Sequence, residues 1–260
     1  MSARAPGRRD VVAAALAAAA LWPPRAAAAD APAEIPPDRP VRIAMLLFRG
    51  MTALDLVGPQ TLLAGLAPGS LHLVGEEAGP VVSDTGLAVM ATDTFETCPQ
   101  ELDVLFVPGG DGTPAQMRNG TLLAFLQGRA ARAGWVTSVC TGSLILGAAG
   151  LLRGYRATSH WCVRDSVLPL LGAEPLAERV VFDRNRVTGA GISAGLDLGL
   201  ALAARLRGEA YARTAQLVAE YAPEPPFRAG TPAEAGTAAV RAADAILAPL
   251  VAGATEAARR

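Results

Sequence analysis

Residues 135–152 of the chain, WVTSVCTGSLILGAAGLL, join a short apolar run to a helical pattern. The first part contains β-branched residues and favours a strand, whereas the second has the apolar spacing of a helix. Cys140 lies where the strand gives way to the helix. At that position a cysteine could be a buried small hydrophobe, a disulfide partner, a metal ligand or a nucleophile.

The rest of the chain repeats this alternation of strand and helix. Residues 41–48, VRIAMLLF, and residues 102–107, LDVLFV, are nearly continuous apolar runs, as in strands that are covered on both faces. Residues 81–95 and 180–191 each carry turn-forming residues between two extended runs, which predicts two hairpins. The alternation predicts an α/β domain with a mostly parallel sheet.

The composition narrows the possible functions. Of the 260 residues, 51% are apolar and 18% are charged, so the chain can form a sizeable core. A formal net charge of -1 gives no electrostatic reason to expect a nucleic acid as partner. The sequence has two histidines and three cysteines, without a C-x-x-C pair, so we expect neither a metal site nor a cofactor.

The N-terminal segment differs from the remainder. Residues 1–10 are basic, residues 11–22 are apolar and residues 25–34 are mostly small, which is the order of an export signal. Arg8-Arg9 resembles the twin-arginine variant of such signals, and an alanine-rich disordered leader is the alternative. The apolar run is shorter than the ~20 residues of a spanning helix, so no stable membrane span is expected. We therefore expect a periplasmic or secreted protein, and a cytoplasmic one if the signal is not used.

Four segments follow from these patterns: an export signal at 1–29, a proline-rich tether without core contribution at 30–40, an α/β domain at 41–228, and a helical tail at 229–260. Export bears on the cysteines, because oxidising compartments favour disulfide bonds. Cys98 and Cys162 could pair, and otherwise we expect both to be structural or incidental.

Three motifs lie at the ends of predicted strands. They are Arg49-Gly50 leading to Asp55, then Pro108-Gly109-Gly110, and then Cys140. Ligands of parallel sheets bind at the carboxyl ends of the strands. The three motifs together therefore indicate a site more strongly than any of them alone.

Each motif also has an ordinary structural explanation. At the start of a helix, the free backbone N–H groups and the helix dipole would favour a Cys140 thiolate, although the cysteine could simply be buried. Asp55 lies between two leucines, where a raised pKa would suit proton transfer, but it could instead cap a helix. The Gly109-Gly110 loop could offer N–H donors to a ligand or be a common turn. His160 could form a Cys/His dyad or be satisfied locally.

The stretches LDLVGP (54–59), DVLFVPGGDG (103–112) and SVCTGSLILGAAGLLRGYRATSHW (138–161) together resemble the ThiJ/PfpI superfamily, which has a class I glutamine-amidotransferase-like fold. Within it they are most similar to the isonitrile hydratase-like branch, and the resemblance runs from Val41 to Phe227. It implies a flavodoxin-like three-layer α/β/α sandwich, with Cys140 on a strained nucleophile elbow, and a homodimer.

The resemblance also assigns roles to residues. It implies that Cys140, Asp55 and Thr141 are catalytic, with Gly110 as a backbone donor to a developing charge. We further expect Gly109 and His160 to bind the substrate or that charge. Peptidase-like and glyoxalase-like relatives often have histidine after the cysteine, or glutamate at the acidic position. Thr141 and Asp55 at these positions count against both activities.

The implied function is the hydration of an isonitrile, a small-molecule substrate, to an N-substituted formamide through a cysteine thioimidate. The alternative is an exported, non-catalytic domain that binds a small molecule or senses oxidants through its thiol. Hydrolysis of another carbonyl or nitrile-like compound would use the same nucleophile. The residues after Phe227 are too few for the DNA-binding helices of AraC-type regulators.

Overall fold

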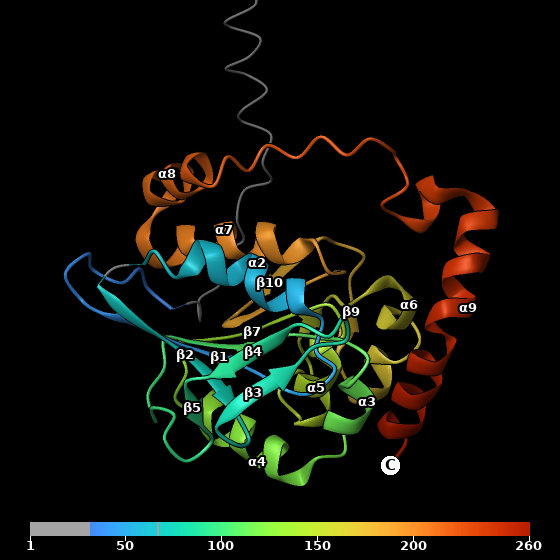
Figure 1. Cartoon of the computed structure of the whole chain (residues 1–260), viewed down its shortest axis with the longest axis horizontal. Helices are drawn as coiled ribbons and strands as arrows, with labels where there is room; N and C mark the ends of the chain where they lie inside the picture. Colours follow the sequence, from blue (N-terminus) through green and yellow to red (C-terminus); the bar gives the residue numbers. More distant parts are fainter. Residues whose placement is uncertain (1–31, 67) are drawn as a thin grey trace, which may run out of the picture.

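The computed structural model describes residues 32–66 and 68–260 (Figure 1). The predicted export signal lies outside these residues. Within them the chain forms a seven-stranded sheet of order β10-β11-β7-β6-β1-β2-β5, in which every neighbouring pair is parallel except β10 and β11. The strands of this sheet are β1 (Val41–Leu46), β2 (Gly69–Gly75), β5 (Asp93–Thr94), β6 (Val104–Val107), β7 (Trp135–Val139), β10 (Val180–Asp183) and β11 (Arg186–Gly189).

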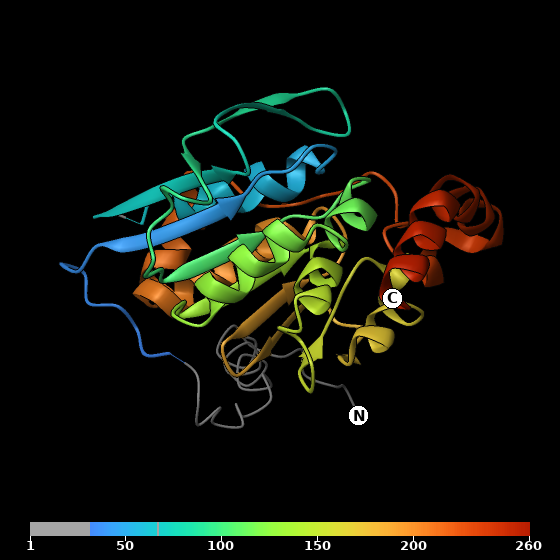
Figure 2. The same cartoon turned by 90° about the horizontal axis from the view of Figure 1, so that it is seen from below.

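Helices cover both faces of the sheet, so the predicted three-layer α/β/α sandwich is confirmed. α2 and α7 pack together on one face, and α4 and α5 lie on the other (Figures 1 and 2). The helices are α2 (Ala53–Leu63), α3 (Thr113–Gln116), α4 (Gly120–Ala130), α5 (Gly142–Ala148), α6 (Trp161–Arg164), α7 (Ala194–Arg207), α8 (Glu209–Val218), α9 (Pro232–Ala258) and the short 3-10 turn η1 (Leu168–Leu171).

The central strands are buried as their apolar sequences predict. Every residue of β6 and β7 is buried, and Phe106 and Trp135 are among the largest fully buried side chains. Both predicted hairpins are present. β3 (Gly79–Val82) pairs antiparallel with β4 (Ala88–Ala91), and β10 pairs antiparallel with β11. A further small pair, β8 (Arg156–Ala157) and β9 (Glu174–Pro175), lies beside the main sheet.

The segment before β1 differs from its prediction as a tether outside the core. Ile35 is 7% exposed and belongs to the core, and its backbone N–H donates to the carbonyl of Leu206 at 2.9 Å. The Arg207 guanidinium donates to the carbonyls of Ile35 and Arg39 at 3.0 and 2.8 Å. An arginine at the end of α7 therefore fixes this segment, a contact between distant residues that its proline-rich composition does not reveal.

The C-terminal tail contains α9, which is kinked at Gly236 (φ 78) and includes Pro249. Within residues 32–66 and 68–260, α9 is the one helix whose length and composition would allow it to cross a membrane. Its apolar 18-residue window has a mean hydropathy of 1.3, and none of that window is buried. α9 nevertheless contacts α3 and α6, so one side of it lies against the α/β domain.

Candidate active site

Cys140 forms a sharp turn between β7 and α5. Its φ of 57° lies in the left-handed region, which is strained for a residue with a side chain. Its N–H donates to the carbonyls of Gly189 and Ala190, at 3.1 and 2.8 Å. Its carbonyl accepts hydrogen bonds from the hydroxyls of Ser159 and Ser143, at 3.0 and 3.3 Å. These four bonds hold the strained backbone, so the predicted strained turn at Cys140 is confirmed, and its role as nucleophile stays a prediction.

Asp55 lies in the first turn of α2 and is completely buried. The N-cap of α2 is Thr52, so the explanation of Asp55 as a helix cap is wrong. Oδ2 of Asp55 instead accepts a hydrogen bond from the backbone N–H of Gly109 at 2.8 Å. Oδ1 is also buried, and it accepts no hydrogen bond from the residues that the structure describes. One carboxyl oxygen is thus held by the glycine loop, and the other is available to a reacting group.

Burial raises the pKa of Asp55 from its ordinary value to about 7. The Gly109 N–H and the nearby Cys140 thiol act in the opposite direction, and the charge of Asp84 raises the pKa further. A carboxyl that titrates near neutral pH can both accept and deliver a proton during one reaction. This is the raised pKa that the apolar sequence around Asp55 predicts.

The prediction that the start of α5 favours a Cys140 thiolate is wrong for the resting site. The residue is 5% exposed, and burial, followed by the charge of Asp55, raises the pKa of its thiol well above the ordinary value. The backbone N–H of Thr141 lowers this pKa, but it does not compensate for the loss of solvent. The resting pair is therefore a neutral thiol beside a carboxyl whose pKa is close to 7.

The glycine loop contacts the elbow directly. A Cβ at Gly109 would lie 2.5 Å from the backbone nitrogen of Thr141, so only glycine fits this approach. The N–H of Gly109 is bonded to Asp55, and the N–H of Gly110 donates to Oγ1 of Thr141 at 3.0 Å. The expected role of Gly110 as a donor to a developing charge is therefore corrected: its N–H holds the elbow.

Thr141 contributes through two different groups. Its side chain is completely buried, and Oγ1 lies 2.8 Å from Oγ1 of Thr113, the first residue of α3. Together with the bond from Gly110, this contact occupies the hydroxyl within the protein. Its backbone N–H is directed toward the Cys140 thiol and stabilises the thiolate form. Thr141 thus links the elbow to α3 and steadies negative charge on sulfur.

His160 lies near the elbow but its hydrogen bonds are local. Its Nδ1 is 3.0 Å from Sγ of Cys162, and it also accepts from the Cys162 N–H at the start of α6. Burial lowers the pKa of His160, and burial raises that of Cys162 to about 11. A Cβ at Gly191 would lie 3.0 Å from the ring, so His160 packs on the loop that follows Ala190. These contacts agree with the locally satisfied alternative, and substrate binding by His160 stays a prediction.

All three cysteines are free, so the possible pairing of Cys98 with Cys162 is not formed in this structure. Within the described residues no group of three or more metal-ligating side chains occurs.

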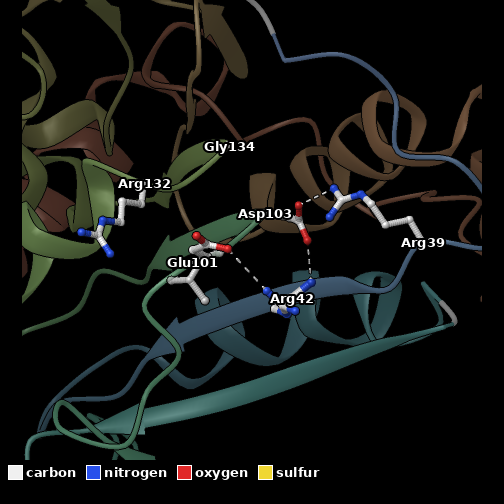
Figure 3. Close-up of a pocket in the computed structure, with 7 residues that line it drawn as sticks. Arg39, Arg42, Glu101, Asp103, Arg132 and Gly134 are labelled. Carbon is white, nitrogen blue, oxygen red and sulfur yellow. Dashed lines mark hydrogen bonds and ion pairs between the residues drawn. The ribbon is translucent and has the colours of Figure 1, made fainter.

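A separate cavity of about 310 Å³ opens at the other edge of the sheet, where β1, β6 and β7 begin (Figure 3). Its charges are largely paired with one another. Arg39 donates to Asp103 at 2.6 Å, and the backbone N–H of Arg42 donates to the same carboxylate at 2.8 Å. The cavity is lined by Arg39, Arg42, Glu101, Leu102, Asp103, Arg132 and Gly134. It contains neither Cys140 nor Asp55.

Comparison with known proteins agrees with this architecture. The sequence profile of the DJ-1/PfpI family matches residues 41–205. The chain belongs to the DJ-1/PfpI family. A ThiJ/PfpI family protein from Pseudomonas syringae, known from a crystal structure, is 50% identical and superposes with a TM-score of 0.84, covering 86% of this chain and 93% of that one.

Two curated relatives with different names align with this chain. Over 200 residues the chain is 51% identical to the isonitrile hydratase of Pseudomonas putida, covering 77% of this chain and 87% of that enzyme. It is 30% identical over 183 residues to the HTH-type transcriptional regulator GbdR of Pseudomonas aeruginosa, covering 67% of this chain and 49% of the regulator. The resemblance to the isonitrile hydratase-like branch is therefore confirmed.

The sequence patterns identified Cys140, Asp55 and the Gly109-Gly110 loop, which the structure brings together. They missed Ser159 and Thr113, which bond to the elbow from other segments. Serine and threonine are common in such segments, so only the contacts themselves reveal these roles.

Proposed function

We propose that this DJ-1/PfpI protein hydrates an isonitrile, R–N≡C, to the N-substituted formamide R–NH–CHO, with Cys140 as nucleophile. The observation that carries the proposal is the buried Asp55 carboxyl, whose pKa is about 7, beside a neutral Cys140 thiol. The 51% identity to the Pseudomonas putida isonitrile hydratase over 200 residues supports the same reaction class.

In the first step, the S–H bond of Cys140 adds across the isonitrile carbon. The Asp55 carboxylate takes the thiol proton and delivers it to that carbon, while the sulfur forms a bond to the same atom. The product is the thioimidate Cys–S–CH=N–R, which contains all atoms of both reactants. Asp55 ends the step as a carboxylate, so it acts as a proton relay.

In the second step, water adds to the thioimidate carbon. Asp55 takes a proton from this water as the carbon–oxygen bond forms and delivers it to the nitrogen, so it is again a carboxylate. The resulting adduct, Cys–S–CH(OH)–NH–R, breaks its carbon–sulfur bond. The hydroxyl proton passes through Asp55 to the sulfur, which restores the thiol and releases R–NH–CHO. The Thr141 N–H steadies the sulfur while it carries negative charge.

The geometry favours this reaction over acyl transfer. An isonitrile accepts the proton and the nucleophile at one carbon, so the acid and the thiol must be neighbours, as Asp55 and Cys140 are. Acyl transfer instead needs N–H donors for an oxyanion. The two N–H groups of the glycine loop are already bonded, to Asp55 and to Thr141.

The burial of Cys140 argues against the thiol-sensing alternative. Cysteines that respond to oxidants have low pKa values and are accessible to solvent. Cys140 has a raised pKa and is 5% exposed. The same environment suits a nucleophile that is activated only when a substrate and Asp55 share the thiol proton.

The experiment is incubation of the purified protein with cyclohexyl isonitrile, with the formamide followed by mass spectrometry. We expect N-cyclohexylformamide to accumulate catalytically, with many equivalents formed per protein. Performing the reaction in D₂O should place deuterium at the formyl carbon, because the proton on that carbon comes from exchangeable Cys140 and Asp55 positions. No formamide above a protein-free control, across a panel of alkyl isonitriles, would disprove the proposed activity.

A further inference from the structure

We infer that α9 forms a specificity-determining wall of the Cys140 site, limiting the size of the group that reaches the thiol. The selection of an isonitrile R group by α9 rests on the proposed function. The effect of α9 on access to the Cys140 thiol rests on the packing of this helix alone.

The position of α9 is the first observation. The parallel strands end at the edge of the sheet where Cys140 follows β7, and α9 runs along this side of the molecule (Figures 1 and 2). α9 contacts both α3 and α6. Each of these short helices begins beside the elbow, so α9 connects two segments that flank the nucleophile.

The contact with α3 brings α9 close to Thr141. A Cβ at Gly253 would lie 3.1 Å from Cβ of Pro114, so the helices approach closely at a residue without a side chain. Pro114 follows Thr113, whose hydroxyl lies 2.8 Å from that of Thr141. The neighbouring Ala254 is completely buried. One end of the wall is therefore separated from the elbow only by the first turn of α3.

The contact with α6 lies on the other side of the elbow. Asp244 of α9 is near enough to Cys162 for its charge to raise the pKa of that thiol. Cys162 in turn acts electrostatically on Cys140, and its sulfur is 3.0 Å from His160. From Asp244 to Gly253 the helix rises by about 14 Å, at about 1.5 Å per residue. This segment of α9 joins its contact with α6 to its contact with α3.

The face of α9 toward the domain is apolar. Val240, Ala243, Leu247, Val251 and Ala254 recur at intervals of three or four residues and are buried or partly buried. Ile246, on the opposite side, is 78% exposed. An apolar wall favours apolar groups, and it excludes those that are too large to pass between α9 and the elbow.

The test compares two leucine substitutions at adjacent positions. Gly253→Leu places a side chain against Pro114 and should move α9 away from α3, whereas Ala252→Leu adds the same side chain at an exposed position. The readout is the rate of Cys140 alkylation by iodoacetamide and by the bulkier N-cyclohexylmaleimide, measured by peptide mass spectrometry. Gly253→Leu should raise the ratio of the bulky to the small reagent several-fold, and Ala252→Leu should leave it unchanged.

A second pair of variants tests the opposite change in access to Cys140. With this pair the inference can be tested even if Gly253→Leu does not fold. Leu247→Trp enlarges the inner face and should lower the same ratio, while Ile246→Trp, on the exposed face, should not. Thermal unfolding of each variant verifies folding. Unchanged ratios in folded Gly253→Leu and Leu247→Trp would overturn the inference.

Alkylation requires no isonitrile turnover, so the two proposals can fail separately. If the ratios shift as expected but no isonitrile is hydrated, α9 is a wall of the site and the proposed reaction is wrong. If isonitriles are hydrated but the ratios do not change, the reaction stands and the role of α9 is wrong. In the variants that shift the ratio, the KM for cyclohexyl isonitrile relative to methyl isonitrile should shift in the same sense.

Discussion

The backbone N–H of Gly109 donates to Oδ2 of Asp55 at 2.8 Å, within a fully buried environment. This bond fixes the carboxyl group while its other oxygen remains available beside Cys140. Burial makes the charged form of Asp55 costly, and its pKa rises to about 7. The glycine loop therefore sets the position of the acid, and burial keeps it protonated up to about neutral pH.

The pH dependence of turnover should follow Asp55. The carboxylate form must accept the thiol proton, so kcat/KM should fall as the pH drops through about 7, the pKa of Asp55. A plot of kcat/KM for cyclohexyl isonitrile from pH 5 to pH 9, within the range of stable folding, measures this dependence. A flat profile across pH 7 would contradict the assignment of Asp55 as proton relay.

Stability should depend on pH in the opposite direction. The pKa of Asp55 is higher in the folded state, so the folded protein binds the proton more tightly than the unfolded chain. The contribution of Asp55 to the free energy of unfolding should therefore decrease from about pH 4 to about pH 7, by up to ~4 kcal/mol. Urea unfolding across this range measures the change.

Asp55→Asn provides the matched variant for that measurement. The amide oxygen can still accept from Gly109, but the side chain no longer ionises. We expect this variant to be more stable than the wild type at pH 8 and to lose about 10²–10⁴-fold in kcat/KM. Equal stability of the two proteins at pH 8 would show that burial of the charge carries no cost.

The stability of the protein should depend on the hydroxyl group of Thr141 rather than on the size of its side chain. Thr141→Val leaves the Gly110 N–H and the Thr113 hydroxyl without their partner, so we expect a loss of about 1–3 kcal/mol in the free energy of unfolding. Thr141→Ser retains the hydroxyl and serves as the control. Chemical denaturation of both variants is the measurement, and a valine variant as stable as the serine variant would contradict the described network.

Export remains a proposal of the sequence. Arg8-Arg9 and the apolar run after it predict a signal that is removed near Asp30. Mass spectrometry of the protein isolated from its native cell should then give a mature N-terminus close to that residue, in the periplasmic or secreted fraction. If the protein is instead found in the cytoplasm with its N-terminal segment intact, the predicted export and signal cleavage are wrong.

The homodimer is likewise a proposal, and light scattering after gel filtration measures it. We expect twice the mass of one chain. A single-chain mass at micromolar concentration would contradict this expectation.

The sequence predicts the central strands, the mostly parallel sheet and both hairpins, because buried parallel strands are continuous apolar runs and the hairpins carry turn residues. Cys140, Asp55 and Gly109 were recognisable because parallel strands bring their carboxyl ends to one edge. The family resemblance then assigned their roles.

Other features depend on contacts that no local pattern records. The helix start after Cys140 predicts a thiolate, but the completed fold buries the thiol beside Asp55 and reverses the direction of the pKa change. Gly110 carries an N–H like any other residue, and only the fold shows that Thr141 accepts it. The anchoring of Ile35 by Arg207 joins segments far apart in the chain.

The most direct test of the account compares formamide production by Cys140→Ala with that by Cys98→Ala, each verified as folded by thermal unfolding. Cys98 is also a buried free cysteine but does not belong to the site. We expect Cys98→Ala to hydrate cyclohexyl isonitrile at nearly the wild-type rate and folded Cys140→Ala to produce no formamide above background. Substantial catalytic turnover by folded Cys140→Ala would contradict the central claim that Cys140 is the nucleophile.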